Sequence, residues 1–178
     1  HEELDKMDLD GMVIWRRGDF TLEGIIKSET IDVKLSYRVA SEITDDWKKS
    51  IAYRALSKIL MERGDKEESL RVASEITDAT QKSKAYAAIS KVLMERGDTK
   101  ESKKVMTESL RVASEITDES GTSASLAISK VLMERGDKEE SLRVASEITD
   151  ARRKSLAYAE ISKVLMERGD KEESKKVM

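Results

Sequence analysis

Apolar residues recur along most of the chain at the spacing of one helical face. Between residues 151 and 168, Tyr158, Ile161 and Leu165 stand three and four positions apart, as on an amphipathic helix. The shorter stretch 66–77 carries a second stripe of this kind, and no run of residues alternates with period two for long enough to predict a strand. The pattern predicts an all-α protein in which longer and shorter helices alternate.

The predicted pair of helices is a unit that repeats along the chain. The string MERGD begins at positions 61, 94, 133 and 166, so successive copies are 33, 39 and 33 residues apart. Residues 65–106 align without gaps with residues 137–178, and only six of these 42 positions differ. We therefore expect antiparallel helix-pair repeats of about 33 residues, stacked so that each pair buries the apolar face of its neighbours.

The repeats divide the chain into two regions. Residues 36–178 contain about four helix pairs. Residues 1–35 hold a degenerate repeat, because the stretch 13–19 echoes the end of the unit, and we expect this region to cap the stack. Residues 169–178 match a stretch inside the array that runs on into another helical pattern, so we expect the array to be truncated at the C-terminus.

The tripeptide Arg-Gly-Asp ends each longer helix, and it has two interpretations. It occurs at residues 17–19, 63–65, 96–98, 135–137 and 168–170. As a helix break, the glycine takes the left-handed conformation that ends a helix, and the aspartate caps the next one, with a glutamate three residues later in four copies. The same tripeptide is known as an adhesion motif. Because the copies carry the chemistry of a helix boundary, we favour the structural interpretation.

Four positions of the longer helix recur from copy to copy, except that Ser125 stands where the other copies have tyrosine. A large aromatic is followed three positions later by leucine or isoleucine, then by serine, and three positions further by leucine, as in Tyr86, Ile89, Ser90 and Leu93. Together with the Gly-Asp turn, these positions make residues 36–178 resemble the tetratricopeptide repeat family. The chain departs from that family in lacking the closing proline, in using serine where the family has glycine, and in a period one residue shorter.

The resemblance implies a right-handed superhelical solenoid whose first helices line a concave groove that binds a peptide or protein segment. It places the groove on the stripe of each first helix that lies opposite the tyrosine and isoleucine positions. The candidate groove residues are Lys58, Met61, Glu62, Lys91, Met94, Glu95, Lys130, Met133, Glu134, Lys163, Met166 and Glu167. Lysines separated by adaptable methionines suit an acidic or amphipathic peptide. Lysine and glutamate four residues apart also describe an ion-paired, solvated helix face, and this alternative stays open.

The positions that differ between the two near-identical blocks form a second set of candidates. Four of the six differences fall at the start of a first helix. Each of these candidates differs from the residue at the matching position of the other block. The variable candidate contacts are Lys84, Ala88, Arg152, Arg153, Leu156 and Glu160. These positions have either diverged for a partner or drifted on an exposed surface.

Composition narrows the chemistry that such helices can carry. The chain has 178 residues, no cysteine and a single histidine, His1. We therefore expect no disulfide, no thiolate zinc site and no cysteine- or histidine-dependent catalysis, hence neither an enzyme nor a cofactor or metal. The net charge of −3 gives no electrostatic reason to expect nucleic acid as a partner. No apolar run has the length of a membrane span, so we expect no membrane association and a cytoplasmic protein.

The sequence thus leads to one functional hypothesis and two alternatives. The hypothesis is a non-catalytic protein–protein interaction scaffold with a protein or peptide ligand. The first alternative is a structural or assembly repeat protein that associates with itself, because near-identical repeats present near-identical surfaces. The second is an engineered repeat scaffold with no native ligand. The 39% of charged residues, with asparagine absent, is thermophile-like and is also typical of a designed sequence.

Overall fold

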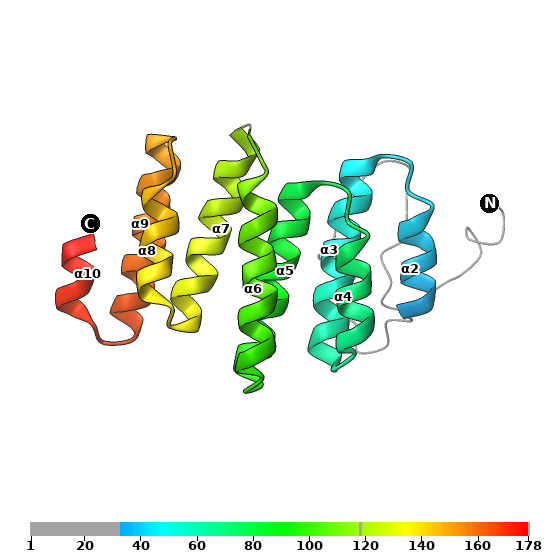
Figure 1. Ribbon diagram of the computed structural model, residues 1–178, viewed down its shortest axis with the longest axis horizontal. Coiled ribbons are helices and arrows are strands. Elements are labelled where there is room, and N and C mark those ends of the chain that lie inside the picture. The colour runs from blue at the N-terminus through cyan, green and yellow to red at the C-terminus, as the bar shows by residue number, and fades with distance from the viewer. Residues whose placement is uncertain (1–32, 118, 178) are drawn as a thin grey trace, which may run out of the picture.

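The structure is a computed structural model that describes residues 33–117 and 119–177 of the chain. This part contains α-helices joined by turns and no strand, which confirms the all-α prediction for it (Figure 1). The helices are α2 (Val33–Ser41), α3 (Asp46–Arg63), α4 (Lys66–Ser74), α5 (Ala79–Glu95), α6 (Thr99–Ser114), α7 (Glu119–Arg135), α8 (Lys138–Ser146), α9 (Ala151–Glu167) and α10 (Lys171–Val177). Most of the predicted cap at 1–35, with the degenerate copy at 13–19, lies outside the described residues.

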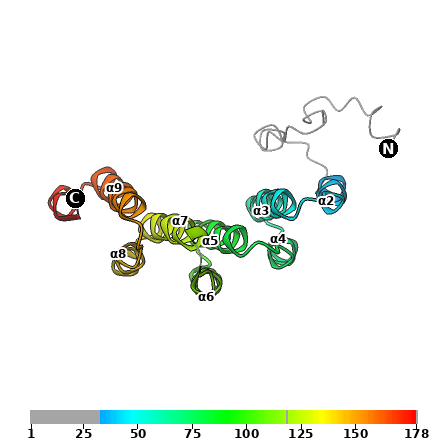
Figure 2. The same ribbon diagram turned by 90° about the horizontal axis from the view of Figure 1, so that it is seen from above.

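The helices of the repeats form two groups. The first helices α3, α5, α7 and α9 lie side by side in a row, and each packs against the next one (Figure 2). The second helices α4, α6 and α8 lie together on one side of that row, and each packs against the first helix that precedes it. Figure 2 also shows that the row is bowed, with the second helices on its outer side and with α2 and α10 at its two ends.

Neighbouring helix pairs share their hydrophobic core. The leucine or isoleucine that recurs in the first helix is buried in every described copy, at Leu56, Ile89, Ile128 and Ile161. One buried cluster combines Ala87 of α5, Met106 of α6, Ile128 of α7 and Val144 of α8, so it spans two consecutive pairs. A single pair of short helices cannot bury its apolar face alone, and the shared clusters supply what each pair lacks.

Buried serines hold the two helices of each pair close together. Ser69 donates its hydroxyl to the backbone carbonyl of Ser57 at 2.6 Å. The next pair repeats this contact between Ser102 and Ser90 at 2.6 Å, and the following pair repeats it between Ser141 and Ser129 at 2.6 Å. A side chain of this size lets two helix backbones approach closely, and the hydrogen bond satisfies the hydroxyl inside the core. The structure therefore explains why serine recurs at these positions.

The Gly-Asp turns have the geometry of helix ends. Gly64, Gly97, Gly136 and Gly169 all have positive φ, between 82° and 94°, which glycine adopts without the strain that a Cβ brings. The side chains of Asp65 and Asp98 accept hydrogen bonds from the backbone N–H three residues later, as predicted for capping aspartates. Asp137 departs from the prediction. It makes no capping hydrogen bond, and its carboxylate lies 3.1 Å from the Arg135 guanidinium.

Two of the arginines that precede these glycines form hydrogen bonds between repeats. Arg96 donates to the backbone carbonyl of Glu62 at 2.5 Å, and Arg168 donates to that of Glu134 at 2.6 Å. Each bond ties the end of a first helix to the end of the previous first helix. In the Arg-Gly-Asp tripeptide at 96–98 all three residues thus have structural roles, and at 168–170 the arginine and the glycine have the same roles, in agreement with the favoured interpretation.

Candidate interaction surface

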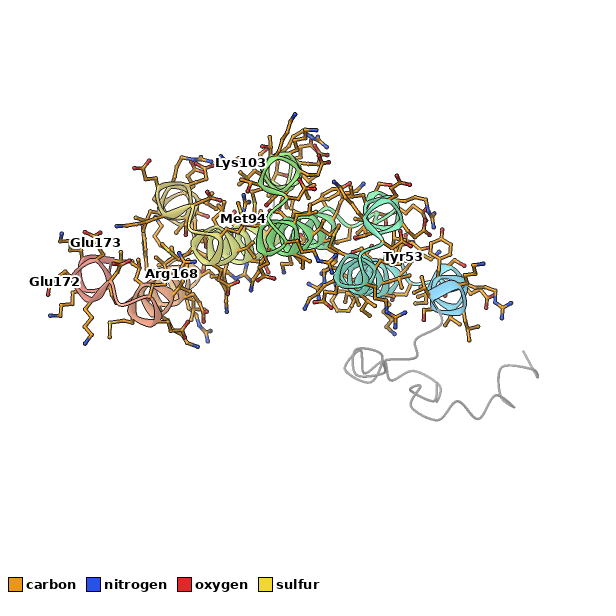
Figure 3. All side chains as sticks on the ribbon, turned by 90° about the horizontal axis from the view of Figure 1, so that it is seen from below. Tyr53, Met94, Lys103, Arg168, Glu172 and Glu173 are labelled. Atoms are coloured by element: carbon orange, nitrogen blue, oxygen red, sulfur yellow. The ribbon has the colours of Figure 1, made fainter. Side chains whose placement is uncertain are left out.

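The side of the first-helix row away from α4, α6 and α8 is the place where the sequence predicts a groove. Among the described helices, no second helix lies on this side, which we call the free face (Figure 2). Figure 3 shows the side chains along the row, with Tyr53 near its α2 end and Glu172 at its α10 end. The predicted groove residues are considered first, and the variable positions after them.

The predicted lysine ladder is engaged in ion pairs. Lys91 on α5 lies 2.6 Å from the Glu134 carboxylate on α7, and Lys130 on α7 lies 2.7 Å from the Glu160 carboxylate on α9. The second pair raises the pKa of Lys130 and lowers the pKa of Glu160, in each case mainly through their shared hydrogen bond. These contacts join consecutive first helices, and they agree with the interpretation of this stripe as an ion-paired face.

The remaining lysines and glutamates of the predicted groove are at the surface. Lys58 lies 3.6 Å from Glu62 on the same helix, and Lys91 is also 3.9 Å from Glu95. Lys163 and Glu167 on α9 are both exposed. Exposed ion pairs of this kind stabilise the folded protein by only about 0.2–1 kcal/mol each. A partner can therefore form ion pairs with these charges in their place at a small cost in free energy.

The methionines of the predicted groove do not form an exposed ladder. Met61 and Met133 are each only 1% exposed, Met94 is half-buried, and Met166 is 50% exposed. Met133 belongs to the buried cluster that contains Ala157 and Ile161 of α9, because its side chain faces the first helix that follows. The assignment of Met61 and Met133 to a groove surface is therefore wrong: both are core residues between repeats.

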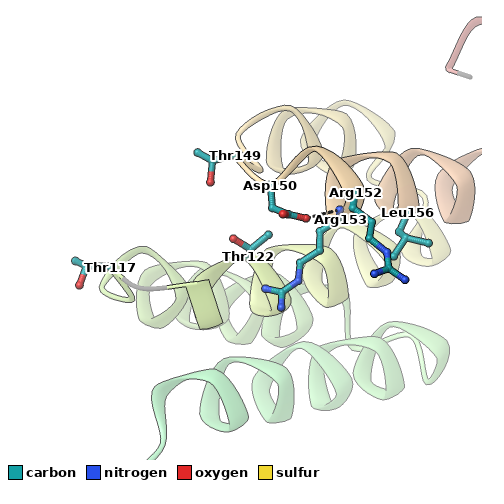
Figure 4. Close-up of a pocket in the computed structure, with 7 residues that line it drawn as sticks. All are labelled: Thr117, Thr122, Thr149, Asp150, Arg152, Arg153 and Leu156. Carbon is teal, nitrogen blue, oxygen red and sulfur yellow. Dashed lines mark hydrogen bonds between the residues drawn. The ribbon is translucent and has the colours of Figure 1, made fainter.

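Three of the variable positions come together at an open hollow on α9. The hollow has a volume of about 680 Å³, and its lining residues are Thr117, Thr122, Thr149, Asp150, Arg152, Arg153 and Leu156 (Figure 4). Leu156 is 49% exposed there. Figure 4 shows the Arg153 side chain extending from α9 toward α7. The Asp150 carboxylate accepts a hydrogen bond from the backbone N–H of Arg153 at 2.7 Å and so caps α9.

The other variable positions make contacts between first helices. Lys84 on α5 donates to the Ser123 hydroxyl on α7 at 2.7 Å, Ala88 is half-buried, and Glu160 pairs with Lys130 as described above. Burial lowers the pKa of Lys84, and the positive charges of Arg54 and Arg153 add to this effect. Three positive side chains, from α3, α5 and α9, therefore lie near enough to influence one another.

The hollow lies beside the connection before α7, because Thr117 and Thr122 line it on either side of Gly121. Gly121 stands near the start of α7, and a Cβ on it would lie 2.8 Å from the backbone oxygen of Ile116, which is too close for any side chain. The chain thus passes itself closely at this point. The three threonines of the lining were not among the predicted site residues, because Thr117 and Thr149 follow a repeated isoleucine and indicate only a turn in the sequence.

Searches against protein-family models, curated proteins and solved structures found no match to this chain. Within residues 33–117 and 119–177, no group of three or more histidine, cysteine, aspartate or glutamate side chains is arranged to hold a metal ion. In the same part of the chain, no helix combines the length and the apolar character that crossing a membrane requires.

Proposed function

We propose that the protein is a non-catalytic interaction scaffold that binds an acidic, partly apolar peptide or protein segment on its free face. In this proposal the helix pairs form a right-handed, tetratricopeptide-like solenoid, and the ligand lies along the first helices. The residues 152, 153 and 156 at the hollow between α7 and α9 supply the principal contacts. The shared cores between consecutive pairs and the position of α4, α6 and α8 on one side of the row support this architecture.

The observation that carries the proposal is where the two near-identical blocks differ. Thr80, Gln81 and Lys84 in the first block are replaced by Arg152, Arg153 and Leu156 in the second. Thr80 and Gln81 are buried, whereas their replacements line an open hollow. Since the rest of the two blocks is almost unchanged, the same fold buries these positions in the first block and places them at the hollow in the second.

The chemistry of the hollow indicates the class of ligand. Two guanidinium groups favour a carboxylate, which arginine can bind through two parallel hydrogen bonds. The exposed Leu156 offers apolar surface beside them, and the threonine hydroxyls can donate to backbone carbonyls of an extended segment. The positive charges of Arg54 and Lys84, which act electrostatically on each other and with Arg153, add to the attraction for an acidic ligand.

A pair of labelled peptides tests the proposal. One peptide alternates glutamate with leucine, and the other has lysine in place of each glutamate; their binding is measured by fluorescence anisotropy. The variant Arg153→Gln with Leu156→Lys gives both positions the residues found at 81 and 84, so the fold already accepts them in the other block. It also leaves the net charge of the chain unchanged.

We expect the acidic peptide to bind and the double variant to bind it at least tenfold more weakly, which corresponds to about 1.4 kcal/mol. Arg111→Gln on the outer side of α6 is the matched control, and it should bind like the original chain. Equal binding of the acidic and basic peptides, or equal binding by the double variant, would show that the hollow is not the site.

A further inference from the structure

Two positive side chains of the first-helix row lie near each other without a carboxylate to pair them. They are Arg54 on α3 and Lys84 on α5, and both are half-buried. Burial lowers the pKa of Lys84, and the nearby positive charge of Arg54 lowers it further. Within residues 33–117 and 119–177 neither side chain forms an ion pair, whereas Lys91 and Lys130 further along the row are both paired.

A hydroxyl group from the next first helix joins these two cations. The Lys84 amine donates to the Ser123 hydroxyl on α7 at 2.7 Å, and Ser123 is half-buried as well. A serine oxygen that accepts this bond keeps its own proton, which it can donate to a ligand. A guanidinium, an amine and a hydroxyl from three consecutive first helices therefore meet, and we call Arg54, Lys84 and Ser123 the cationic cluster.

The cationic cluster has a surplus of positive charge. Asp78 favours the charged form of Lys84, but its carboxylate accepts the backbone N–H of Gln81 at 2.7 Å and caps α5. Arg153 on α9 adds a third positive charge that lowers the pKa of Lys84. Like charges that share a partly buried place cost free energy, so an anion bound between them would be stabilised.

The other repeats show that the fold does not require these charges. The matching positions in the other first helices hold apolar residues: Ala87, Leu126 and Ala159 match Arg54, and Ile51 and Leu156 match Lys84. Packing between first helices thus proceeds with alanine, leucine or isoleucine at these places. A half-buried charge that packing does not require, beside a second like charge, indicates a site for a ligand.

We infer that the cationic cluster binds a phosphate group. A phosphate ester carries a charge of about −1.5 to −2 at pH 7 and three acceptor oxygens, which matches two cations and a hydroxyl better than a single carboxylate does. Arginine can bind two of the oxygens in parallel, and lysine acts as a point charge. The phosphate belongs either to a phosphorylated side chain of the bound segment, a source that rests on the proposed function, or to the free ion.

Peptides test the first source. The peptide that alternates glutamate with leucine is made as a series with phosphoserine at one position after another, each matched by the same peptide with serine. In fluorescence anisotropy the original chain should bind the best phosphopeptide at least tenfold more tightly than its serine match. For Arg54→Ala and for Lys84→Leu, which introduce residues found at the matching positions, this advantage should fall below about threefold.

A variant elsewhere on the surface controls for the loss of one positive charge. Lys103→Ala on the outer helix α6 removes an exposed amine and should keep the full advantage of the phosphopeptide (Figure 3). Circular dichroism checks that each variant folds. An advantage that is as large in Arg54→Ala and Lys84→Leu as in the original chain overturns the inference.

Inorganic phosphate tests the cationic cluster without a peptide. The titration of Lys84 is followed by NMR of its ε-carbon, whose signal is identified by its loss in Lys84→Leu. Millimolar phosphate should raise the pKa of Lys84, because an anion beside the amine favours its charged form, whereas chloride at equal ionic strength should not. The rise should be much smaller in Arg54→Ala. A pKa of Lys84 that is the same in phosphate and in chloride overturns the inference.

The two proposals can fail separately. If no peptide binds but inorganic phosphate raises the pKa of Lys84, the proposed function fails and the cationic cluster remains a site for the free ion. If the acidic peptide binds through the hollow, phosphoserine gives no advantage and phosphate leaves Lys84 unchanged, the cationic cluster fails as a phosphate site and the proposed function stands.

Discussion

The burial of one methionine and the exposure of its counterpart give the sharpest test of how the repeats pack. Met133 and Met166 occupy the same position of consecutive first helices, within the same string MERGD. Met133 is 1% exposed and packs against α9, whereas Met166 is 50% exposed. If this position faces the following first helix, the same substitution should have very different costs at the two sites.

Met133→Ala removes a fully buried side chain from the shared core. Truncation of a buried methionine to alanine costs about 2–5 kcal/mol, since it loses the apolar burial and leaves a cavity that the neighbours fill only in part. At half exposure and with no packed neighbour on one side, Met166→Ala should cost less than about 1 kcal/mol. We therefore expect a difference of at least about 1 kcal/mol between the two variants.

Urea unfolding followed by circular dichroism measures this difference. Both variants are compared with the original chain at the same low protein concentration. The dependence of the unfolding free energy on urea should be similar in both chains, because a change in that slope would indicate that the repeats unfold separately. Similar losses of stability in the two variants would refute the reasoning and would return Met133 to the list of candidate groove residues.

Three further predictions concern the turns, the helix pairs and the tyrosine cluster. Gly97→Ala should cost about 1 kcal/mol in the same urea experiment, because its φ of 82° disfavours a Cβ although no atom within 4 Å would touch it; an unchanged midpoint would contradict this. Ser102→Val should destabilise by about 1–3 kcal/mol, since it overfills the close contact with Ser90, whereas Ser114→Val on the surface should not. Burial, with the nearby Tyr37, raises the pKa of Tyr53 to about 12, and burial also raises the pKa of Tyr86. Tyrosinate absorbance should therefore show phenols that ionise late, and the stability linked to Tyr53 should persist below pH 10 and fall as the pH rises through about 12. Titration of every phenol near pH 10 would contradict this.

The parts of the fold that could be predicted are those that depend on neighbours in the sequence. Gly64 and Asp65 form a helix end because positive φ and side-chain capping are local properties of a few residues. The spacing of Tyr53, Leu56 and Leu60 likewise fixes which side of the helix is apolar before any partner is known. The failed cap at Asp137 marks the limit of such reasoning, because the competing Arg135 side chain is held almost fully buried by the tertiary structure.

The surface could not be predicted in the same way, because it depends on how consecutive first helices sit against each other. Met61 was expected on a groove, but its position turns toward α5 once the helices pack, and no local pattern encodes that angle. The hollow beside Leu156 likewise forms only where residues near the close approach of Gly121 to Ile116 meet residues at the start of α9.

The sequence itself contains two nearly identical blocks, residues 65–106 and 137–178, that can be compared with each other. Two blocks that differ at six of 42 positions act as controls for each other, because the fold is shared and only the surroundings change. The residues that changed at the start of α9 line the hollow, and residues that stayed the same, Ser155 and Ala159, are buried in one block and bare in the other. The first contrast singles out a surface for a ligand, and the second shows which side of a first helix packs against the next one. Both contrasts arise from the duplication, so an internal repeat gives a functional argument as well as an architectural one.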